Sequence, residues 1–166
     1  MAFSSCQSYR VGCGANRARK SSPRMANCKD ECEALMSALL PVAERMLSEH
    51  HALRPFGCTL SANDQIVQVG GFGAVAAVDD AALIAQFRAS FRDGAARGEL
   101  KATALSYSAP SAVPGQGAAR DAVFVHLNHR DNYSLVVTFP YHFGAEGELV
   151  IEEPFANDGE YDVFVG

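Results

Sequence analysis

The chain has 166 residues, of which 48% are hydrophobic and 20% are charged, and its net charge is −5. This length suits a single domain, and the composition excludes disorder throughout the chain as well as fibrous and collagen-like structure. The longest nearly apolar stretch, residues 69–78, has about half of the roughly 20 residues that a helix needs to span a bilayer. We therefore expect a globular domain that does not enter a membrane.

Positive charge is concentrated in the first 24 residues, which contain five basic residues and no acidic residue. Residues 25–166 hold the other nine basic residues (14 minus 5) and all 19 acidic residues, so their net charge is −10. We expect residues 1–24 to be a disordered basic extension or a wrongly assigned start, followed by one α+β domain over residues 25–166. The extension has three interpretations: translation that begins at Met25, an organelle transit peptide, or a basic arm that binds nucleic acid or another acidic surface.

The five cysteines are an odd number, and no apolar stretch typical of a secretory signal follows the first basic residues. Both observations favour free thiols and a cytoplasmic location. Cys28 and Cys32, four residues apart on a predicted helix, are too distant from each other for a disulfide bond. Their spacing from Cys6 and Cys13 does not match a zinc-binding motif, so we expect neither a metal site nor a cofactor.

Residues 27–50 are predicted to form the first helix, because apolar residues recur there at every third or fourth position. Asn27 is the expected N-cap, and the acidic residues just after it suit the positive end of the helix dipole. Pro41 lies inside the apolar stripe, which predicts a kink or a restart of the helix at this point.

Two strands are expected next, at residues 56–60 and 65–69, joined by a polar turn. Residues 71–76 then match the letters G-x-G-x-x-A of a dinucleotide-binding loop. That chemistry requires a helix directly after the glycines and an acidic residue at the end of the following strand. The sequence lacks this arrangement, so we interpret the glycines as a strand exit with close backbone packing.

A second helix is predicted to begin at Asp79 or Asp80 and to end near Gly94 or Gly98. A weakly alternating strand at residues 101–108 follows. Residues 109–119 are rich in proline and glycine and are expected to form a long loop.

The clearest unit is a hairpin of residues 122–129 and 133–142. If Asn132 is left-handed in a three-residue loop, apolar side chains of both strands share one face of the sheet. The expected pairs are His129 with Tyr133, Leu127 with Leu135, Val125 with Val137, and Val123 with Phe139. The opposite face then carries His126, Asn128, Ser134, Thr138 and His142, which we predict as a candidate ligand face. A solvated sheet face is the competing interpretation.

Further strands are predicted at residues 148–152 and 161–165, with a turn at residues 157–159 between them. The expected fold class is therefore α+β. It consists of an antiparallel sheet of about five to six strands with two helices packed on one face, in the order α-β-β-α-β-β-β-β. The sequence contains no catalytic motif of a common enzyme class, so no catalytic residue is predicted.

Acidic residues dominate the C-terminal region, which has no lysine or arginine beyond Arg130. We predict that a basic protein partner binds there, because a concentration of one charge attracts the opposite sign. The predicted partner-binding residues are Glu148, Glu152, Glu153, Asp158, Glu160 and Asp162. The same negative charge argues against nucleic acid as a partner of the main domain.

The sequence Arg54-Pro55-Phe56-Gly57 after a helix rich in Leu and Met, the strands that follow, and the acidic end at residues 161–166 resemble small bacterial α+β proteins. Some of those are proposed immunity partners of polymorphic toxins. The resemblance concerns the layout of residues 25–166 and implies a cytoplasmic protein-binding module without catalytic activity. The alternative is a small-molecule-binding domain or small enzyme with a pocket between helices and sheet, gated by residues 109–119.

Overall fold

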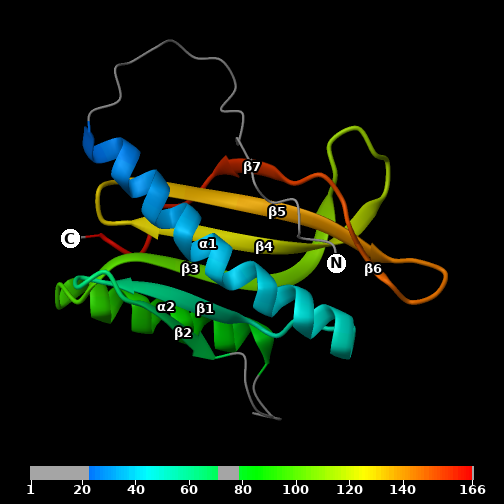
Figure 1. The fold of residues 1–166 in the computed structure, drawn as a ribbon, viewed down its shortest axis with the longest axis horizontal. Helices are drawn as coiled ribbons and strands as arrows, with labels where there is room; N and C mark the ends of the chain where they lie inside the picture. The colour runs from blue at the N-terminus through cyan, green and yellow to red at the C-terminus, as the bar shows by residue number, and fades with distance from the viewer. Residues whose placement is uncertain (1–22, 71–78, 166) are drawn as a thin grey trace.

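The computed structural model describes residues 23–70 and 79–165. Its elements are α1 (Pro23–His50), β1 (Phe56–Ser61), β2 (Ile66–Gly70), α2 (Asp80–Ala96), β3 (Leu100–Ala112), β4 (Ala119–His129), β5 (Tyr133–Phe143), β6 (Leu149–Ile151) and β7 (Phe155–Asp158). The predicted α+β class and the order of its helices are confirmed (Figure 1). Cys6, Cys13, residues 1–22 of the basic extension and the glycine-rich stretch 71–76 lie outside the described residues.

One antiparallel sheet forms the centre of the fold, with the strand order β2-β1-β3-β4-β5. Both β6 and β7 pair with β5, so they complete the edge of the sheet opposite β2. The described residues thus form seven strands rather than five or six. The additional strand is β7, part of which the sequence pattern assigned to a turn.

Helix α1 begins before its predicted N-cap and runs without a break through Pro41. Asn27 therefore lies within the helix, where its side-chain amide donates to Glu31 Oε1 over 3.2 Å, and the first turn carries no acidic residue. Pro41 is exposed, so the carbonyl that loses its hydrogen-bond donor lies near water. The opposite side of α1 is the predicted apolar stripe, and it packs on the sheet with fully buried Leu35, Leu39 and Leu47.

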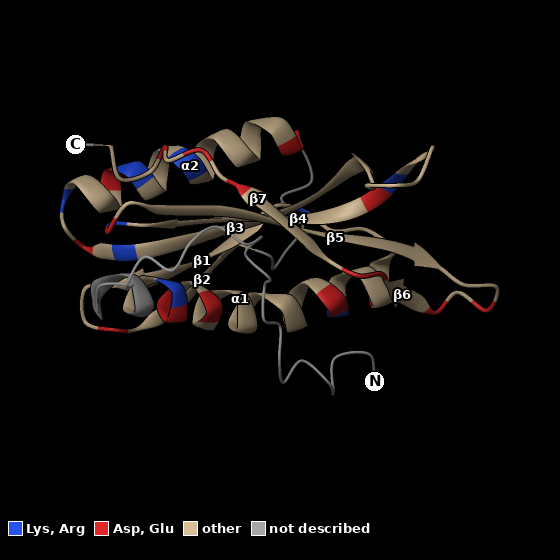
Figure 2. Ribbon diagram, turned by 90° about the horizontal axis from the view of Figure 1, so that it is seen from above, with Lys and Arg blue, Asp and Glu red and all other residues tan. Residues whose placement is uncertain are grey.

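The two helices lie on opposite faces of the sheet, which corrects the prediction of both on one face (Figure 2). Strand β3 shows the reason, because Ala102 and Ala104 face α1 whereas Leu105 and Tyr107 face α2. Both faces of the sheet are therefore apolar and each needs a cover. A Cβ atom added at Gly57 would lie 2.7 Å from a ring carbon of Phe91, so glycine at this position permits the close approach of α2.

The hairpin of β4 and β5 has the predicted register: His129 pairs with Tyr133, Leu127 with Leu135, Val125 with Val137, and Val123 with Phe139. Asn132 adopts the predicted left-handed conformation, with φ of 60°. The apolar face of this hairpin packs against α1. The alternation of apolar residues was thus sufficient to define this part of the sheet.

The loop predicted at residues 109–119 is shorter than expected. Strands β3 and β4 remain paired as far as Ala112 and Ala119, so half of the predicted loop belongs to the sheet. Pro110 is accommodated because β1 pairs with β3 only as far as Ser106, which leaves the other side of β3 unpaired at the proline.

The strand predicted at residues 161–165 is absent, and this prediction is wrong. These residues leave the sheet after β7 and lie against α2, where Val163 is buried beside Phe87 and Phe91. The Nε atom of Arg92 donates to the backbone carbonyl of Asp162 over 2.7 Å. The alternating sequence of residues 161–165 predicted hydrogen bonds to a neighbouring strand, but this segment packs on α2 instead.

Candidate functional site

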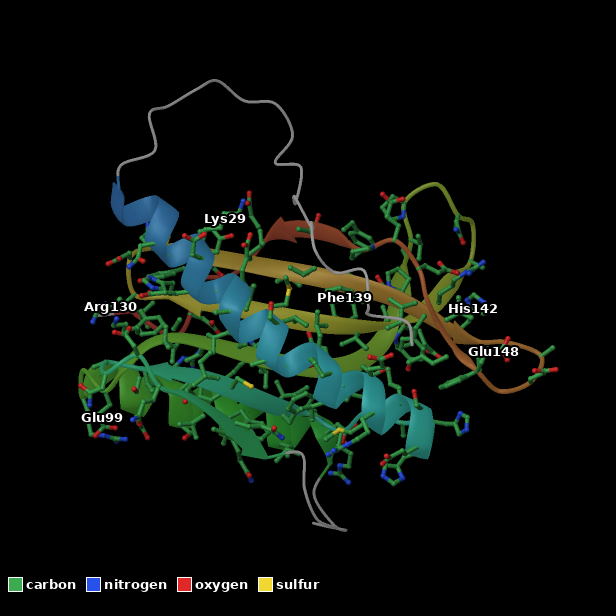
Figure 3. All side chains as sticks on the ribbon, viewed as in Figure 1. Lys29, Glu99, Arg130, Phe139, His142 and Glu148 are labelled. Atoms are coloured by element: carbon green, nitrogen blue, oxygen red, sulfur yellow. The ribbon has the colours of Figure 1, made fainter. Side chains whose placement is uncertain are left out.

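The six acidic residues predicted to bind a partner lie just before and just after β6, at the end of β7, and on the segment that follows β7. Because β6 and β7 both pair with β5, the acids beside these two strands border the edge of the sheet opposite β2, whereas Asp162 lies against α2. Figure 3 shows Glu148 and His142 toward the end of the sheet that carries β6, with Arg130 and Glu99 at the other end.

Two of the six carboxylates are already paired within the protein. Glu152 contacts Arg120, and its Oε1 lies 3.2 Å from His142 Nδ1. Asp162 Oδ2 lies 3.6 Å from Arg88 and 3.4 Å from Arg92. Their side chains are each 20% exposed. Both acids therefore fix their own segments in place and offer little charge to a partner.

The remaining acids of this region are exposed and form what we call the acidic edge: Glu146, Glu148, Glu153, Asp158 and Glu160. In the part of the chain that the structure describes, no lysine or arginine forms an ion pair with any of them. Leu149 pairs with Phe143 and Asp158 pairs with Leu135. These two β5 positions are eight residues, or about 27 Å, apart, so the charge extends along the edge rather than gathering at one point.

The predicted ligand face is dispersed in the structure. Asn128 and Thr138 are buried, and Ser134 donates to the backbone carbonyl of Glu160 over 3.0 Å. His126 pairs with Val136, six residues before His142 on β5, which places the two histidines about 20 Å apart. The two histidines therefore have separate polar environments, His142 beside Glu152 and His126 on the partly buried α2 face.

His126 lies in an aromatic group that the sequence pattern did not single out. Its Nε2 atom is 2.8 Å from the hydroxyl of Tyr107, and the Tyr107 ring stacks between Phe124 and His126 at centroid distances of 5.5 and 5.3 Å. The register of β3 with β4 pairs Tyr107 with Phe124, and a prediction of this register would have revealed the aromatic group.

Burial, and to a smaller extent the positive charge of Arg88, lowers the pKa of His126. Burial also raises the pKa of Tyr107, although Arg88 acts in the opposite direction. The histidine is therefore neutral at pH 7, and the tyrosine hydroxyl can donate to its Nε2. A neutral imidazole, a hydroxyl and a nearby guanidinium can form hydrogen bonds to a small polar ligand.

The lowered pKa of His126 predicts a specific dependence of stability on pH. Below the ordinary pKa of 6.5 the unfolded chain binds a proton that the folded chain resists, so stability falls as the pH drops through that range. We expect His126→Gln, which does not titrate, to lose less stability than the parent chain between about pH 8 and about pH 5. Urea unfolding at both pH values measures this, and equal losses in the two proteins would contradict it.

A second polar group, at the opposite face of the sheet, connects α1 to the hairpin of β4 and β5. The Nε2 atom of His129 is 2.5 Å from Glu31 Oε2, and His129 Nδ1 accepts the backbone N–H of Asp131 over 3.0 Å. Glu31 Oε1 also lies 3.5 Å from Lys101, which contacts Asp64. Both ring nitrogens of His129 are therefore engaged, and the ring is 1% exposed, so the group is suited to holding the helix rather than to catalysis.

The described cysteines, Cys28, Cys32 and Cys58, are buried. Burial is the main cause that raises the pKa of Cys32 to about 12 and that of Cys58 to about 11, so both are protonated thiols at neutral pH. Within residues 23–70 and 79–165, no three or more side chains of His, Cys, Asp or Glu come together as a set that could hold a metal ion.

Among the described helices, none combines the length and the apolar composition that crossing a membrane would require. Comparison of the chain with protein-family models, curated proteins and solved structures finds no match. The site therefore has to be interpreted from its own geometry and charge.

Proposed function

We propose that this protein is a non-catalytic, cytoplasmic binding module of the immunity type, whose acidic edge holds a basic protein partner. The observation that carries the proposal is the line of exposed carboxylates of the acidic edge, none of which forms an ion pair with a lysine or arginine of the described residues. Negative charge spread over about 27 Å increases the rate of encounter with a positive surface and fixes its orientation. The partner would be a protein with several lysine or arginine side chains along a matching length.

The arrangement of ion pairs supports this assignment. Arg88, Arg92 and Arg120 neutralise Asp162 and Glu152, yet the chain places no basic residue beside the exposed acids of the edge in its described part. Burying such a carboxylate against a protein surface requires an opposite charge from the partner. A negative surface also disfavours nucleic acid as the partner.

The test is affinity purification from native cells with three versions of the full chain. The edge variant carries Glu153→Lys, Asp158→Lys and Glu160→Lys, which leave Glu152 and Asp162 in their internal ion pairs. The control variant carries Asp30→Lys, Glu49→Lys and Asp93→Lys, three exposed acids on the helices with the same change of net charge.

We expect a basic protein to copurify in equal amounts with the parent chain and the control, and to be reduced at least about tenfold with the edge variant. Binding of the purified pair should also weaken as salt is raised. A partner that binds the edge variant as strongly as the parent chain would exclude the acidic edge as its site.

The group of Tyr107, His126 and Arg88 supports a second candidate, a site for a small polar molecule. Tyr107 and His126 lie on the α2 face of the sheet, near Arg88 of α2, which also pairs with Asp162. A metabolite that raises the melting temperature of the parent chain but not of Tyr107→Phe or His126→Gln would favour this function. If no metabolite of a broad panel raised the melting temperature of the parent chain, that result would count against a small-molecule site.

A further inference from the structure

The two edges of the sheet differ in chemistry. The edge formed by β6 and β7 is flanked by the exposed carboxylates described above, and like charges at an edge disfavour pairing with a second copy. The other edge is β2, whose sequence Ile66-Val67-Gln68-Val69-Gly70 contains no charge and no proline. Ile66 is 43% exposed and Val67 is 50% exposed.

The backbone of β2 is also open for pairing. Ser61 N–H donates to the Gln65 carbonyl over 2.9 Å, and bonded pairs alternate with non-bonded pairs along an antiparallel ladder. Given the register of β1 with β2, Val67 and Val69 bond to β1, whereas Gln68 directs its backbone N–H and C=O away from the sheet. The outward carbonyl of Gly70 accepts the side-chain amide of Gln68 over 3.2 Å, an exposed contact that a partner strand would displace. In the described residues, no strand pairs with this side of β2.

We propose that β2 pairs with β2 of a second copy of this chain, as an antiparallel dimer about a two-fold axis at Gln68. This register places Val67 opposite the partner's Val69 on the α2 face, and bulky Ile66 opposite the partner's Gly70, which has no side chain to clash with it. No like charges meet within the strand, and Asp64, just before it, is paired with Lys101. The proposal does not depend on the function of the acidic edge.

The expected dimer is weak. Two five-residue strands bury less than the roughly 1,200 Å² of a stable interface, so dimerisation should require high protein concentration. A second copy suits this edge better than a charged peptide, because β2 offers no charge to recognise one. A two-fold axis brings the same edge of both copies together, so both sides of the interface are formed by the same residues.

The experiment is sedimentation velocity of the full chain from about 5 to about 500 µM. The parent chain should shift toward a dimer as its concentration rises. Val67→Lys, which adds a charge to the edge, and Gln68→Pro, which removes an outward N–H, should remain monomeric. Val150→Lys, at an exposed valine on β6, should dimerise like the parent chain. A parent chain that stays monomeric, or variants that dimerise equally well, would overturn the proposal.

Amide hydrogen exchange of the parent chain provides a readout that does not depend on folded variants. The Gln68 amide should exchange at least about tenfold more slowly in the dimer, while Val67 and Val69, already bonded to β1, should change little. Protection of Gln68 that does not vary with concentration would assign the edge to a segment of the same chain. Protection that requires another protein would assign it to that protein, and either result would refute self-pairing.

Discussion

Replacing Glu31 by alanine should lower the free energy of unfolding by about 2–3 kcal/mol. The substitution removes the acceptor of the His129 ring, which is almost fully buried, and leaves its Nε2–H without a partner. Because His129 Nδ1 accepts the Asp131 N–H, the ring N–H is at Nε2, which lies against Glu31. Urea unfolding monitored by circular dichroism measures the loss.

Two further substitutions on α1 separate this effect from a general loss of charge. Glu31→Gln retains an oxygen that accepts the Nε2–H, so it should cost less than alanine. Glu33→Ala removes a half-exposed pair with Lys29, at 3.7 Å, and should change stability by less than about 0.5 kcal/mol. If the variants at 31 and 33 were equally stable, the buried pair would not anchor the helix.

Leu39→Ala should cost about 3 kcal/mol or more, because it opens a cavity between α1 and the sheet. Leu39 has no exposed surface, and it belongs to the core cluster that includes Phe56 and Leu127. Its neighbour Leu40 is partly exposed, so Leu40→Ala is a matched control that removes the same atoms with less than half of this loss. Thermal and urea unfolding of the two variants give the comparison. Similar losses would mean that α1 packs less closely than the structure shows.

The sequence predicted best those elements whose signal is local. In the β4–β5 hairpin, a strict alternation of apolar residues and a left-handed Asn132 together determine the register, and the structure agrees pair by pair. The first two strands also follow the pattern, within one residue at each end. In these segments the burial of one face is sufficient to select one pairing over its neighbours.

Features that depend on contacts between distant segments could not be predicted from the sequence pattern. Residues 161–165 alternate like a strand, but Arg88, Arg92 and the ring of Phe91 hold them against α2 instead. Because Ala102 and Ala104 are small, the sequence pattern did not reveal that β3 is apolar on both faces. The position of residues 161–165 and the burial of both faces of β3 depend on contacts with residues that are distant in sequence. Periodicity within one segment carries no information about such contacts.

The candidate site, too, was predicted from the sequence only in part. The sequence located the acidic region, because charge is visible in composition, but it did not distinguish Glu152 and Asp162, which have internal arginine partners, from the exposed acids. It also missed Tyr107 beside His126 and Glu31 beside His129. Each of these pairs is formed across separate elements, so it depends on the completed sheet.

The contact between Glu31 and His129 joins residues that are 98 positions apart, and this separation sets a delay during synthesis. At about 5–20 residues per second, a ribosome needs roughly 5–20 s to add the residues between them. For most of that interval the apolar stripe of α1 has been made, whereas β4, one of the strands that cover it, has not been completed. Until the sheet is complete, a nascent chain of this protein therefore exposes the apolar stripe of α1, and exposed apolar surface of this kind favours chaperone binding and aggregation.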